Sequence, residues 1–245
     1  MNPSMPAIQI LVISLQRSVD RRNKVEQEMQ KISMPWAFLD AVDGSSLTSI
    51  PSEYNPSKVK RLQGYSLTAS EIGCYLSHKE AWKRCVSSSL PTLILEDDFL
   101  FKSNFVETLE ILLNKVSKWD FVRLQGLYEV PFTKIYEVSG ISLVKNHGDP
   151  CGTAAYILKP NVAKILIEHS VDIYEPVDHF LEHYHKHHAE LLAIRPYPVD
   201  VTPLQTTIGD RPGRLPIHGF AKLKRSIFRA IDRWFSKNAW FPKKR

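Results

Sequence analysis

Three consecutive acids, Glu96, Asp97 and Asp98, lie between the apolar run 92–95 and a second apolar stretch at 99–101. A short run rich in Leu and Ile predicts a buried strand. Adjacent carboxylates cannot remain inside a core, because each unpaired ion costs several kcal/mol on burial. The strand must therefore end at the acids and hold them at the carboxyl edge of a sheet, where α/β proteins bind ligands. Carboxylate oxygens suit Mg²⁺ or Mn²⁺; the alternative is a strand that ends in a solvated acidic turn.

Strands alternate with helices along the chain, which predicts an α/β fold with a mixed sheet. The expected strands cover 7–14, 36–39, 92–95, 120–125 and 152–158, with a hairpin turn at Ser139-Gly140. The expected helices cover 19–32 and 68–86, a segment capped by Ser103, and segments that begin at Pro160 and Pro176. Residues 45–66 are rich in Ser and Pro and are expected to form a loop.

Charge is distributed unevenly between the body of the chain and its C-terminal end. Residues 211–245 carry eleven Lys or Arg and one Asp, whereas residues 1–210 carry 21 basic and 25 acidic side chains. A nucleic-acid-binding protein with a basic arm is an alternative, but the mildly acidic body and the lack of a nucleic-acid-binding motif argue against it, so we expect no nucleic acid as a partner. We expect a domain over 1–215 and a separate basic tail over 216–245.

The tail has the pattern of an amphipathic helix. On a helical wheel its apolar side chains fall opposite its basic ones, and the apolar set comprises Phe220, Leu223, Ile227, Ile231 and Trp234. A helix of this kind lies on an anionic membrane surface; the alternative is a helix that packs on the body. The three cysteines, Cys74, Cys85 and Cys151, show no disulfide spacing, and no signal peptide or membrane span is evident. Together these features predict a cytoplasmic protein that associates peripherally with the inner face of the membrane.

Basic and polar side chains follow the first expected strand. Arg17 and Arg21 lie in the strand-to-helix turn, a pattern that favours phosphate binding; a solvated basic helix start is the commoner alternative. Glu71 has a structural explanation, because Thr68-Ala69-Ser70-Glu71 is a capping box. His78 lies inside the same helix, where a single histidine is more often structural than catalytic.

A second chemistry is also open. Residues 179–183 fit the H-x-x-E-H pattern of inverted zincins, with His179 and His183 on one helix face as zinc ligands. A zinc metallopeptidase would need a third ligand, and only Glu190 follows closely. Other histidines crowd this tract, so a chance match is easy.

With these segments in order, the chain resembles glycosyltransferase family 25, the family of bacterial lipooligosaccharide galactosyltransferases. The resemblance rests on seven short blocks in the right order and spacing, and it thins over 45–66 and 126–150. The blocks are Ile13-Ser14-Leu15 with Arg21-Arg22; Phe38-Leu39-Asp40-Ala41; residues 71–78 with Trp82; Leu90-Pro91 with Glu96-Asp97-Asp98; Val122-Arg123-Leu124; residues 152–157; and Pro176-Val177-Asp178.

The resemblance implies a GT-A-like fold, a UDP-sugar donor (most often UDP-galactose), a lipid-linked oligosaccharide acceptor and an inverting mechanism. It also implies a divalent metal, Mn²⁺ or Mg²⁺, on Glu96, Asp97 and Asp98. Donor-binding positions are expected at Ser14, Leu15, Arg17, Arg21, Asp40, Glu71, Ser77, His78, Arg123, Gly152 and Thr153.

Inversion needs a base that takes the proton of the acceptor hydroxyl, and Asp178 is the first candidate. Asp178 is also well placed to stabilise a first helical turn, or to position the acceptor. A catalytically inactive module that binds nucleotide sugars is a further alternative, although the intact acids argue against it.

Overall fold

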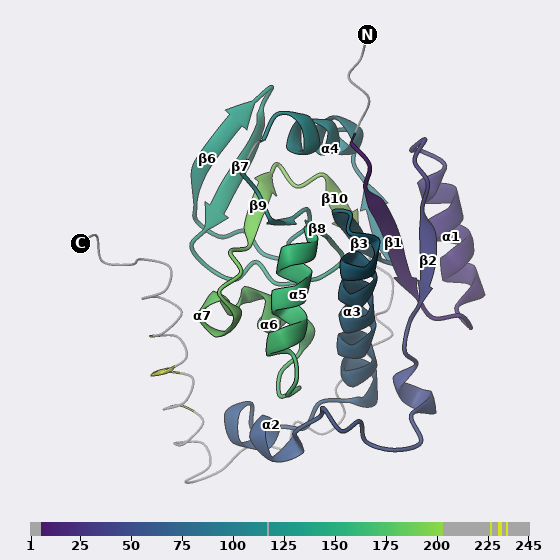
Figure 1. The fold of residues 1–245 in the computed structure, drawn as a ribbon, viewed down its shortest axis with the longest axis vertical. Helices are drawn as coiled ribbons and strands as arrows, with labels where there is room; N and C mark the ends of the chain where they lie inside the picture. Colours follow the sequence, from purple (N-terminus) through teal and green to yellow (C-terminus); the bar gives the residue numbers. More distant parts are fainter. Residues whose placement is uncertain (1–5, 117, 203–225, 227–229, 232–233, 235–245) are drawn as a thin grey trace.

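The computed structural model describes residues 6–116 and 118–202, and four further positions, Ser226, Ala230, Ile231 and Trp234 (Figure 1). The strands are β1 (Gln9–Ser14), β2 (Ala37–Asp40), β3 (Thr92–Glu96), β4 (Phe99–Phe101), β5 (Phe121–Arg123), β6 (Phe132–Val138), β7 (Ile141–Asn146), β8 (Ala155–Leu158), β9 (Leu192–Arg195) and β10 (Val199–Val201). The helices are α1 (Val19–Met29), the short 3₁₀ helix η1 (Gly44–Ser46), α2 (Pro56–Leu62), α3 (Ala69–Ser88), α4 (Phe105–Asn114), α5 (Pro160–His169), α6 (Val177–Glu182) and α7 (Tyr184–His187).

The main sheet contains eight of these strands in the order β2-β1-β3-β8-β5-β9-β7-β6. β1 is parallel to both β2 and β3, and β5 is parallel to β9. β8 is antiparallel to its two neighbours, and β7 and β6 continue antiparallel to the edge. The expected mixed α/β sheet is therefore confirmed.

The direction of β8 decides which segments meet at the end of β3. Leu95 pairs with Ala155, and the Glu96 N–H donates to the Ala154 carbonyl at 2.9 Å. Because β8 runs opposite to β3, the residues that precede β8 lie beside the residues that end β3. Thr153 thus reaches Glu96 although the two are 57 positions apart.

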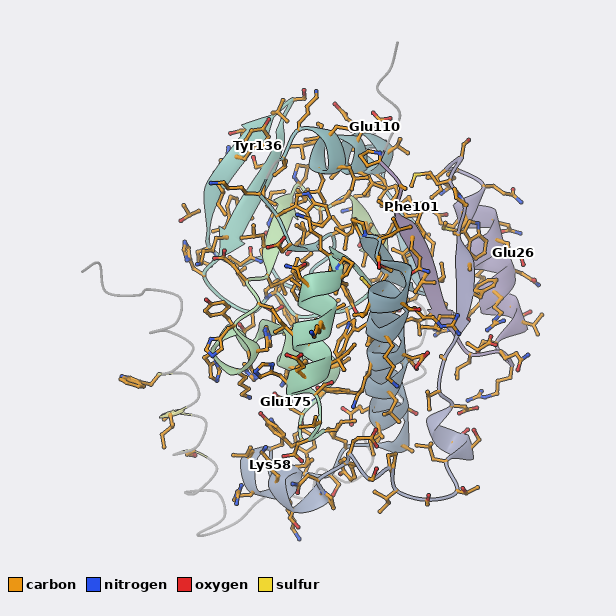
Figure 2. The ribbon with its side chains drawn as sticks, in the orientation of Figure 1. Glu26, Lys58, Phe101, Glu110, Tyr136 and Glu175 are labelled. Atoms are coloured by element: carbon orange, nitrogen blue, oxygen red, sulfur yellow. The ribbon has the colours of Figure 1, made fainter. Side chains whose placement is uncertain are left out.

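Helices cover both faces of the sheet and give three layers (Figure 1). Alternate residues of β1 point to opposite faces, as the two-residue period of a strand requires. Ile10 and Val12 pack with α1 and α4, whereas Leu11 and Ile13 pack with α3, α5 and α6. Side chains fill the space between the helices and the sheet (Figure 2). Trp82 of α3 is fully buried in the second of these cores.

Helix α3 begins as the sequence predicts. The Thr68 hydroxyl accepts from the Glu71 N–H at 3.1 Å, and the Glu71 carboxylate accepts from the Thr68 N–H at 2.8 Å. The hairpin is also confirmed, with Ser139 and Gly140 both at positive φ between β6 and β7. Two residues with positive φ match the twist of a tight hairpin.

Two expectations were wrong in part. Residues 45–66 contain helix α2, in which the Asn55 side chain caps the first turn by accepting from the Lys58 N–H, and Pro56 takes the first helical position. Asn104, not Ser103, precedes α4.

A second small sheet, β4 with β10, joins the segment after the acids to the end of the described body.

The predicted amphipathic tail lies outside the described residues, apart from the four positions named above. Within the residues that the structure describes, no helix is long and apolar enough to cross a membrane.

Candidate active site

A cleft of about 330 Å³ opens at the carboxyl ends of β1 and β3. The parallel strands β1 and β3 end at this edge of the sheet, and the loop that precedes β8 lies beside them. This is the edge at which α/β sheets bind ligands. Most of the predicted site residues line the cleft, namely Ser14, Leu15, Arg17, Arg21, Ser77, His78, Glu96, Asp97, Asp98, Gly152 and Thr153.

Asp97 points back toward β1 and α1. Its Oδ2 accepts from the Ser14 hydroxyl at 2.7 Å, and its Oδ1 accepts from the Arg21 guanidinium at 2.6 Å. Its side chain is 12% exposed. Both carboxylate oxygens therefore have protein partners, and the negative charge of Asp97 is balanced within the protein.

Glu96 points toward α3 and β8. Its Oε1 accepts from Thr153 Oγ1 and lies 3.1 Å from His78 Nε2. Burial disfavours ionisation of Glu96, but the hydrogen bonds from His78 and Thr153 and the nearby charge of Arg21 outweigh it, so the pKa of Glu96 lies below its usual value.

A buried hydrogen-bond chain fixes the orientation of His78. The Trp82 indole N–H donates to the Tyr156 hydroxyl at 2.9 Å, and that hydroxyl lies 2.7 Å from His78 Nδ1. A Tyr156 O–H that donates to Nδ1 places the ring proton on Nε2, which faces Glu96. The chain thus ends in a donor aimed at the first acid of the triplet.

Asp98 differs from its two neighbours. Its Oδ1 is buried and has no hydrogen-bond partner among the described residues. Burial, followed by the charges of Glu96 and Asp97, raises the pKa of Asp98 to about 7. The Thr202 N–H donates to the Asp98 carbonyl at 2.8 Å, so the β4–β10 pair holds this turn in place. An unpartnered carboxylate oxygen in negative surroundings fits a divalent cation.

The rim of the cleft carries an ion pair that the sequence analysis did not anticipate. Arg17 Nε lies 2.5 Å from Asp43 Oδ2. The hydrogen bond and charge of Asp43 raise the pKa of Arg17, and the hydrogen bond from Arg17 holds the pKa of Asp43 well below its usual range. Gly44 follows and packs on α3 so closely that a Cβ would lie 1.9 Å from the Ala69 carbonyl oxygen. The sequence signal for this turn is the pair Asp43-Gly44, because Asp and Gly are typical turn residues.

Four predicted site residues do not line the cleft, and each has another role in the fold. Asp40 is exposed and pairs with Arg22. Glu71 is buried in the capping box. Arg123 is buried beneath the cleft, and Asp178 lies beside it at the start of α6.

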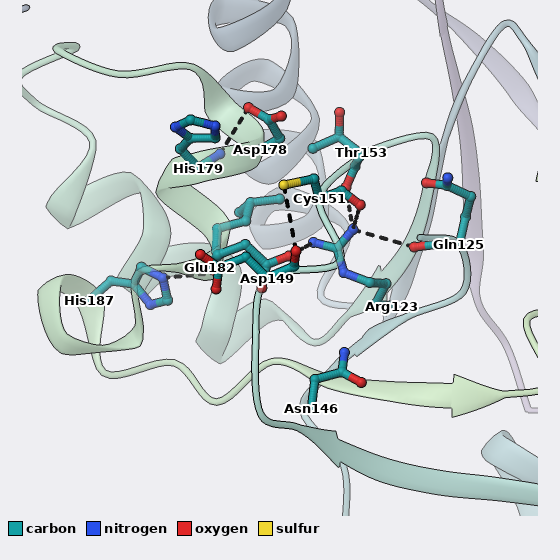
Figure 3. Close-up of polar contacts among 12 residues, drawn as sticks. Arg123, Gln125, Asn146, Asp149, Cys151, Thr153, Asp178, His179, Glu182 and His187 are labelled. Atoms are coloured by element: carbon teal, nitrogen blue, oxygen red, sulfur yellow. Dashed lines mark hydrogen bonds and ion pairs between the residues drawn. The ribbon is translucent and has the colours of Figure 1, made fainter. Parts of the chain in front are cut away.

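Arg123 holds the loop before β8 from below (Figure 3). Its Nη1 donates to the carbonyls of Cys151 at 2.8 Å and Gln125 at 3.3 Å, and also to that of Gly152. Its Nη2 pairs with Glu182, and both side chains are almost fully buried. Gly152 has a φ of +85°, and a Cβ there would lie 2.7 Å from Gln125 Oε1. The position therefore needs glycine.

Asp178 lies near a thiol and an imidazole. Its Oδ1 accepts from the His179 N–H at 2.9 Å. One ligand atom from each of Cys151, Asp178 and His179 falls within 4.8 Å of the others (Figure 3). Burial, together with the charges of Asp178, Glu182 and Asp149, raises the pKa of Cys151 to about 11. Gly152, the next residue, lines the cleft, so Asp178 stands at the cleft rim.

The positions of Glu182 and His183 do not fit the zincin interpretation. Glu182, the base in that pattern, pairs with Arg123 and is almost fully buried. α6 ends at Glu182, and His183 Nδ1 lies 3.0 Å from Glu175 Oε2, whereas His179 lies beside Cys151 and Asp178. The two histidines therefore have separate partners rather than a shared metal site.

The cleft also has lining residues that the sequence analysis missed. Cys74 of α3 and Gln125 after β5 belong to this set, and Thr202 comes from beyond β10. The position of Thr202 depends on the pairing of Val201 with Phe99, for which the sequence carries no local signal.

Comparisons with known proteins identify the family of the chain. Residues 7–181 match the family model "Glycosyltransferase family 25 (LPS biosynthesis protein)". The chain is 32% identical over 184 residues to the human "Inactive glycosyltransferase 25 family member 3", an alignment that covers 71% of this chain and 31% of that protein. It is 31% identical over 168 residues to the "Lipooligosaccharide biosynthesis protein lic2B" of Haemophilus influenzae, covering 64% of this chain and 62% of that protein.

Two further similarities are weaker in coverage or in structure. Human "Procollagen galactosyltransferase 2" is 30% identical over 126 residues, which are 46% of this chain and 20% of that protein. A solved glycosyltransferase involved in the glycosylation of the major capsid of PBCV-1 aligns at a TM-score of 0.33 and 13% identity over 66% of each chain. The aligned part of this chain spans about a third of the length of the human inactive relative.

Proposed function

Because the chain belongs to glycosyltransferase family 25, we propose that it is an inverting hexosyltransferase. Its donor is UDP-galactose, and its acceptor is the saccharide of a lipooligosaccharide or lipopolysaccharide. The observation that carries the proposal is the convergence of Ser14, Arg21, the acidic triplet and the Gly152-Thr153 loop in one cleft at the carboxyl edge of the sheet. In a GT-A-like arrangement this edge receives the nucleotide sugar.

The triplet is proposed to hold a divalent metal, Mn²⁺ or Mg²⁺, with Asp98 as the leading ligand. Asp98 alone of the three acids has a buried oxygen without a partner among the described residues. The other two support it, since Glu96 is oriented by His78 and Asp97 by Arg21. A metal bound there supplies Lewis-acid neutralisation of the diphosphate leaving group.

The chain's own residues are proposed to supply the remaining chemistry. Arg17 and Arg21, which are paired with Asp43 and Asp97, present guanidinium groups to the cleft, and the Gly152-Thr153 loop lets a ligand approach the backbone. Asp178, at the cleft rim, takes the proton of the acceptor hydroxyl as that oxygen attacks the anomeric carbon. The Asp178 carboxylate is half-buried, and one of its oxygens accepts from the His179 N–H.

A second candidate function is an inactive nucleotide-sugar-binding module. Several relatives that match over 71% of this chain carry "inactive" in their names, which favours this alternative. The two functions share donor binding and differ in turnover. Donor hydrolysis separates them, because a binding module would hold UDP-galactose without consuming it.

The deciding experiment measures UDP-galactose hydrolysis and UDP binding by the full chain with Mn²⁺, Mg²⁺ or chelator. We expect metal-dependent hydrolysis by the wild-type protein, and loss of both readouts in Asp98→Asn with an unchanged melting temperature. Asp120→Asn is the matched control, because Asp120 is an exposed acid that pairs with Lys159 before β5. Wild-type turnover in Asp98→Asn would sink the assignment, and tight binding without turnover would favour the inactive module.

The location of the protein is proposed from its sequence. A lipid-linked acceptor is held at the cytoplasmic membrane face, and the basic tail over 216–245 supplies the charge for peripheral attachment there.

A further inference from the structure

The turn before β8 presents a thiol in an unusual backbone conformation. Cys151 has a φ of +55° and is followed by Gly152 at +85°. A non-glycine residue with positive φ is uncommon and persists where the surroundings hold it. Here the buried Arg123 guanidinium binds the carbonyls of both residues and is itself paired with Glu182. The turn is therefore fixed from below, and the Cys151 side chain points toward the start of α6 (Figure 3).

The start of α6 contributes two further donor groups at the same place. Asp178 and His179 are consecutive, and the carboxylate of the first is tied to the backbone N–H of the second at 2.9 Å. With Cys151 they bring one sulfur, one oxygen and one nitrogen ligand atom within 4.8 Å of one another. Tetrahedral zinc needs donors about 3.3–3.8 Å apart, since its bonds are about 2.0–2.3 Å long. Small side-chain rotations close that difference.

The electrostatic surroundings favour a cation at this point. Asp149 and Glu182 add negative charge near the Cys151 thiol, and Arg123 is the opposing charge. All three donor residues are partly exposed, so an ion can reach them from solvent. The donor set differs from the acidic triplet, because thiolate and imidazole select borderline or soft metals and the carboxylates of 96–98 suit hard ones.

We propose that Cys151, Asp178 and His179 form a binding site for a borderline divalent metal such as Zn²⁺, with water as the fourth ligand. On binding, the Cys151 thiol loses its proton to the buffer and the thiolate sulfur donates to the metal. Under the proposed function, occupancy engages Asp178 and so withdraws it from the acceptor hydroxyl. Zinc at this site would then inhibit transfer while the donor site remains free.

The test measures zinc binding by the untagged full chain after chelator treatment, in competition with a chromophoric chelator. We expect one tight Zn²⁺ per chain, weakened at least about tenfold in Cys151→Ser and in His179→Gln, because even outer-shell changes cost that much. Co²⁺ should give a thiolate-to-cobalt charge-transfer absorption that Cys151→Ser abolishes. Melting temperature and circular dichroism show that each variant is folded.

Matched controls come from the same chain. Cys74→Ser tests the other thiol cluster, Cys74 with His78 and Glu96, and His185→Gln tests the neighbouring histidine tract. Both controls should bind zinc as the wild-type protein does. Equal affinity in Cys151→Ser and wild type, or a loss confined to Cys74→Ser, would overturn the proposal. The readout is binding, so it stands or fails independently of transferase activity.

Discussion

At the residue scale, three neighbouring acids have three different surroundings. Glu96 is bound by His78 and Thr153, Asp97 by Ser14 and Arg21, and only Asp98 retains a buried oxygen without a partner among the described residues. Three acids that look equivalent in the sequence therefore have different partners in the fold. The difference depends on which neighbour each side chain meets, and those neighbours come from β1, α1, α3 and the loop before β8.

Asp178→Asn tests the base at this scale. The amide cannot accept a proton but keeps the size and hydrogen bond of Asp178, so we expect transfer to fall by about 10²–10⁴-fold. Donor affinity should change little, because Asp178 does not line the cleft. Steady-state transfer and UDP-galactose binding, with Asp120→Asn beside them, measure both effects. A collapse of donor affinity instead would place Asp178 in the donor site.

At the element scale, the turns before β7 and β8 offer a matched pair of glycines. Gly140 has a φ of +77°, and a Cβ added there would have no atom within 4 Å. Gly152 has a φ of +85°, and a Cβ added there would lie 2.7 Å from Gln125 Oε1. We expect Gly140→Ala to cost about 1 kcal/mol from the left-handed conformation alone. Gly152→Ala should cost a further ~1 kcal/mol, the low end for overpacking, because the nearest atom is the end of the Gln125 side chain, which can shift. Urea unfolding of the two variants measures the difference, and equal costs would contradict the packing argument.

The short helix α7 carries a histidine that resists protonation. His187 is buried, its Nδ1 accepts from the Ala189 N–H at 3.0 Å, and its Nε2 lies 3.3 Å from the Leu181 carbonyl oxygen. This pattern needs neutral imidazole. Burial lowers the pKa of His187 to about 4, whereas an unfolded histidine titrates near ~6.5.

The stability of the fold should therefore depend on pH through His187. Between about pH 6.5 and 4 the unfolded chain binds a proton that the folded chain refuses, so stability falls as the pH is lowered through that window and levels off below it. The full effect is about 3 kcal/mol. His187→Gln should flatten this part of the curve, measured by urea unfolding at stepped pH. A wild-type slope in His187→Gln would refute the assignment.

Elements specified by local signals could be predicted from the sequence. The capping box of α3 and the turn at Ser139-Gly140 each lie within four residues. α2 had such a signal too, since Asn55-Pro56 is a cap followed by a first-turn proline, but the Ser and Pro content of the segment masked it. The direction of β8 and the pairing of β10 with β4 have no local signal, because their partners lie far away along the chain.

At the scale of the whole molecule, the body and the tail differ in charge, and the tail is testable by removal. The full chain should co-sediment with anionic vesicles at low salt and dissociate at high salt, since each basic side chain near an anionic surface contributes about 1 kcal/mol. A chain truncated after Leu215 should stay soluble, still hydrolyse donor and fail to co-sediment. Neutral vesicles are the control. Equal sedimentation of both chains would favour the alternative interpretation, in which the tail is a helix that packs on the body.

The order of strands in the sheet differs from their order along the chain, and this has a consequence for how the protein is made. The β6–β7 hairpin is contiguous and can form as soon as it leaves the ribosome. Among the described strands it joins the rest of the sheet through β9, which lies between β7 and β5. The acidic turn likewise lacks the pairing of β4 with β10 and the hydrogen bond from Thr202 until residues 199–202 have been synthesised. During synthesis the cleft is therefore incomplete until nearly all of the body has been made. Until β9 is available to pair, the edges of β5 and β7 are exposed, and exposed strand edges can pair with other chains and aggregate.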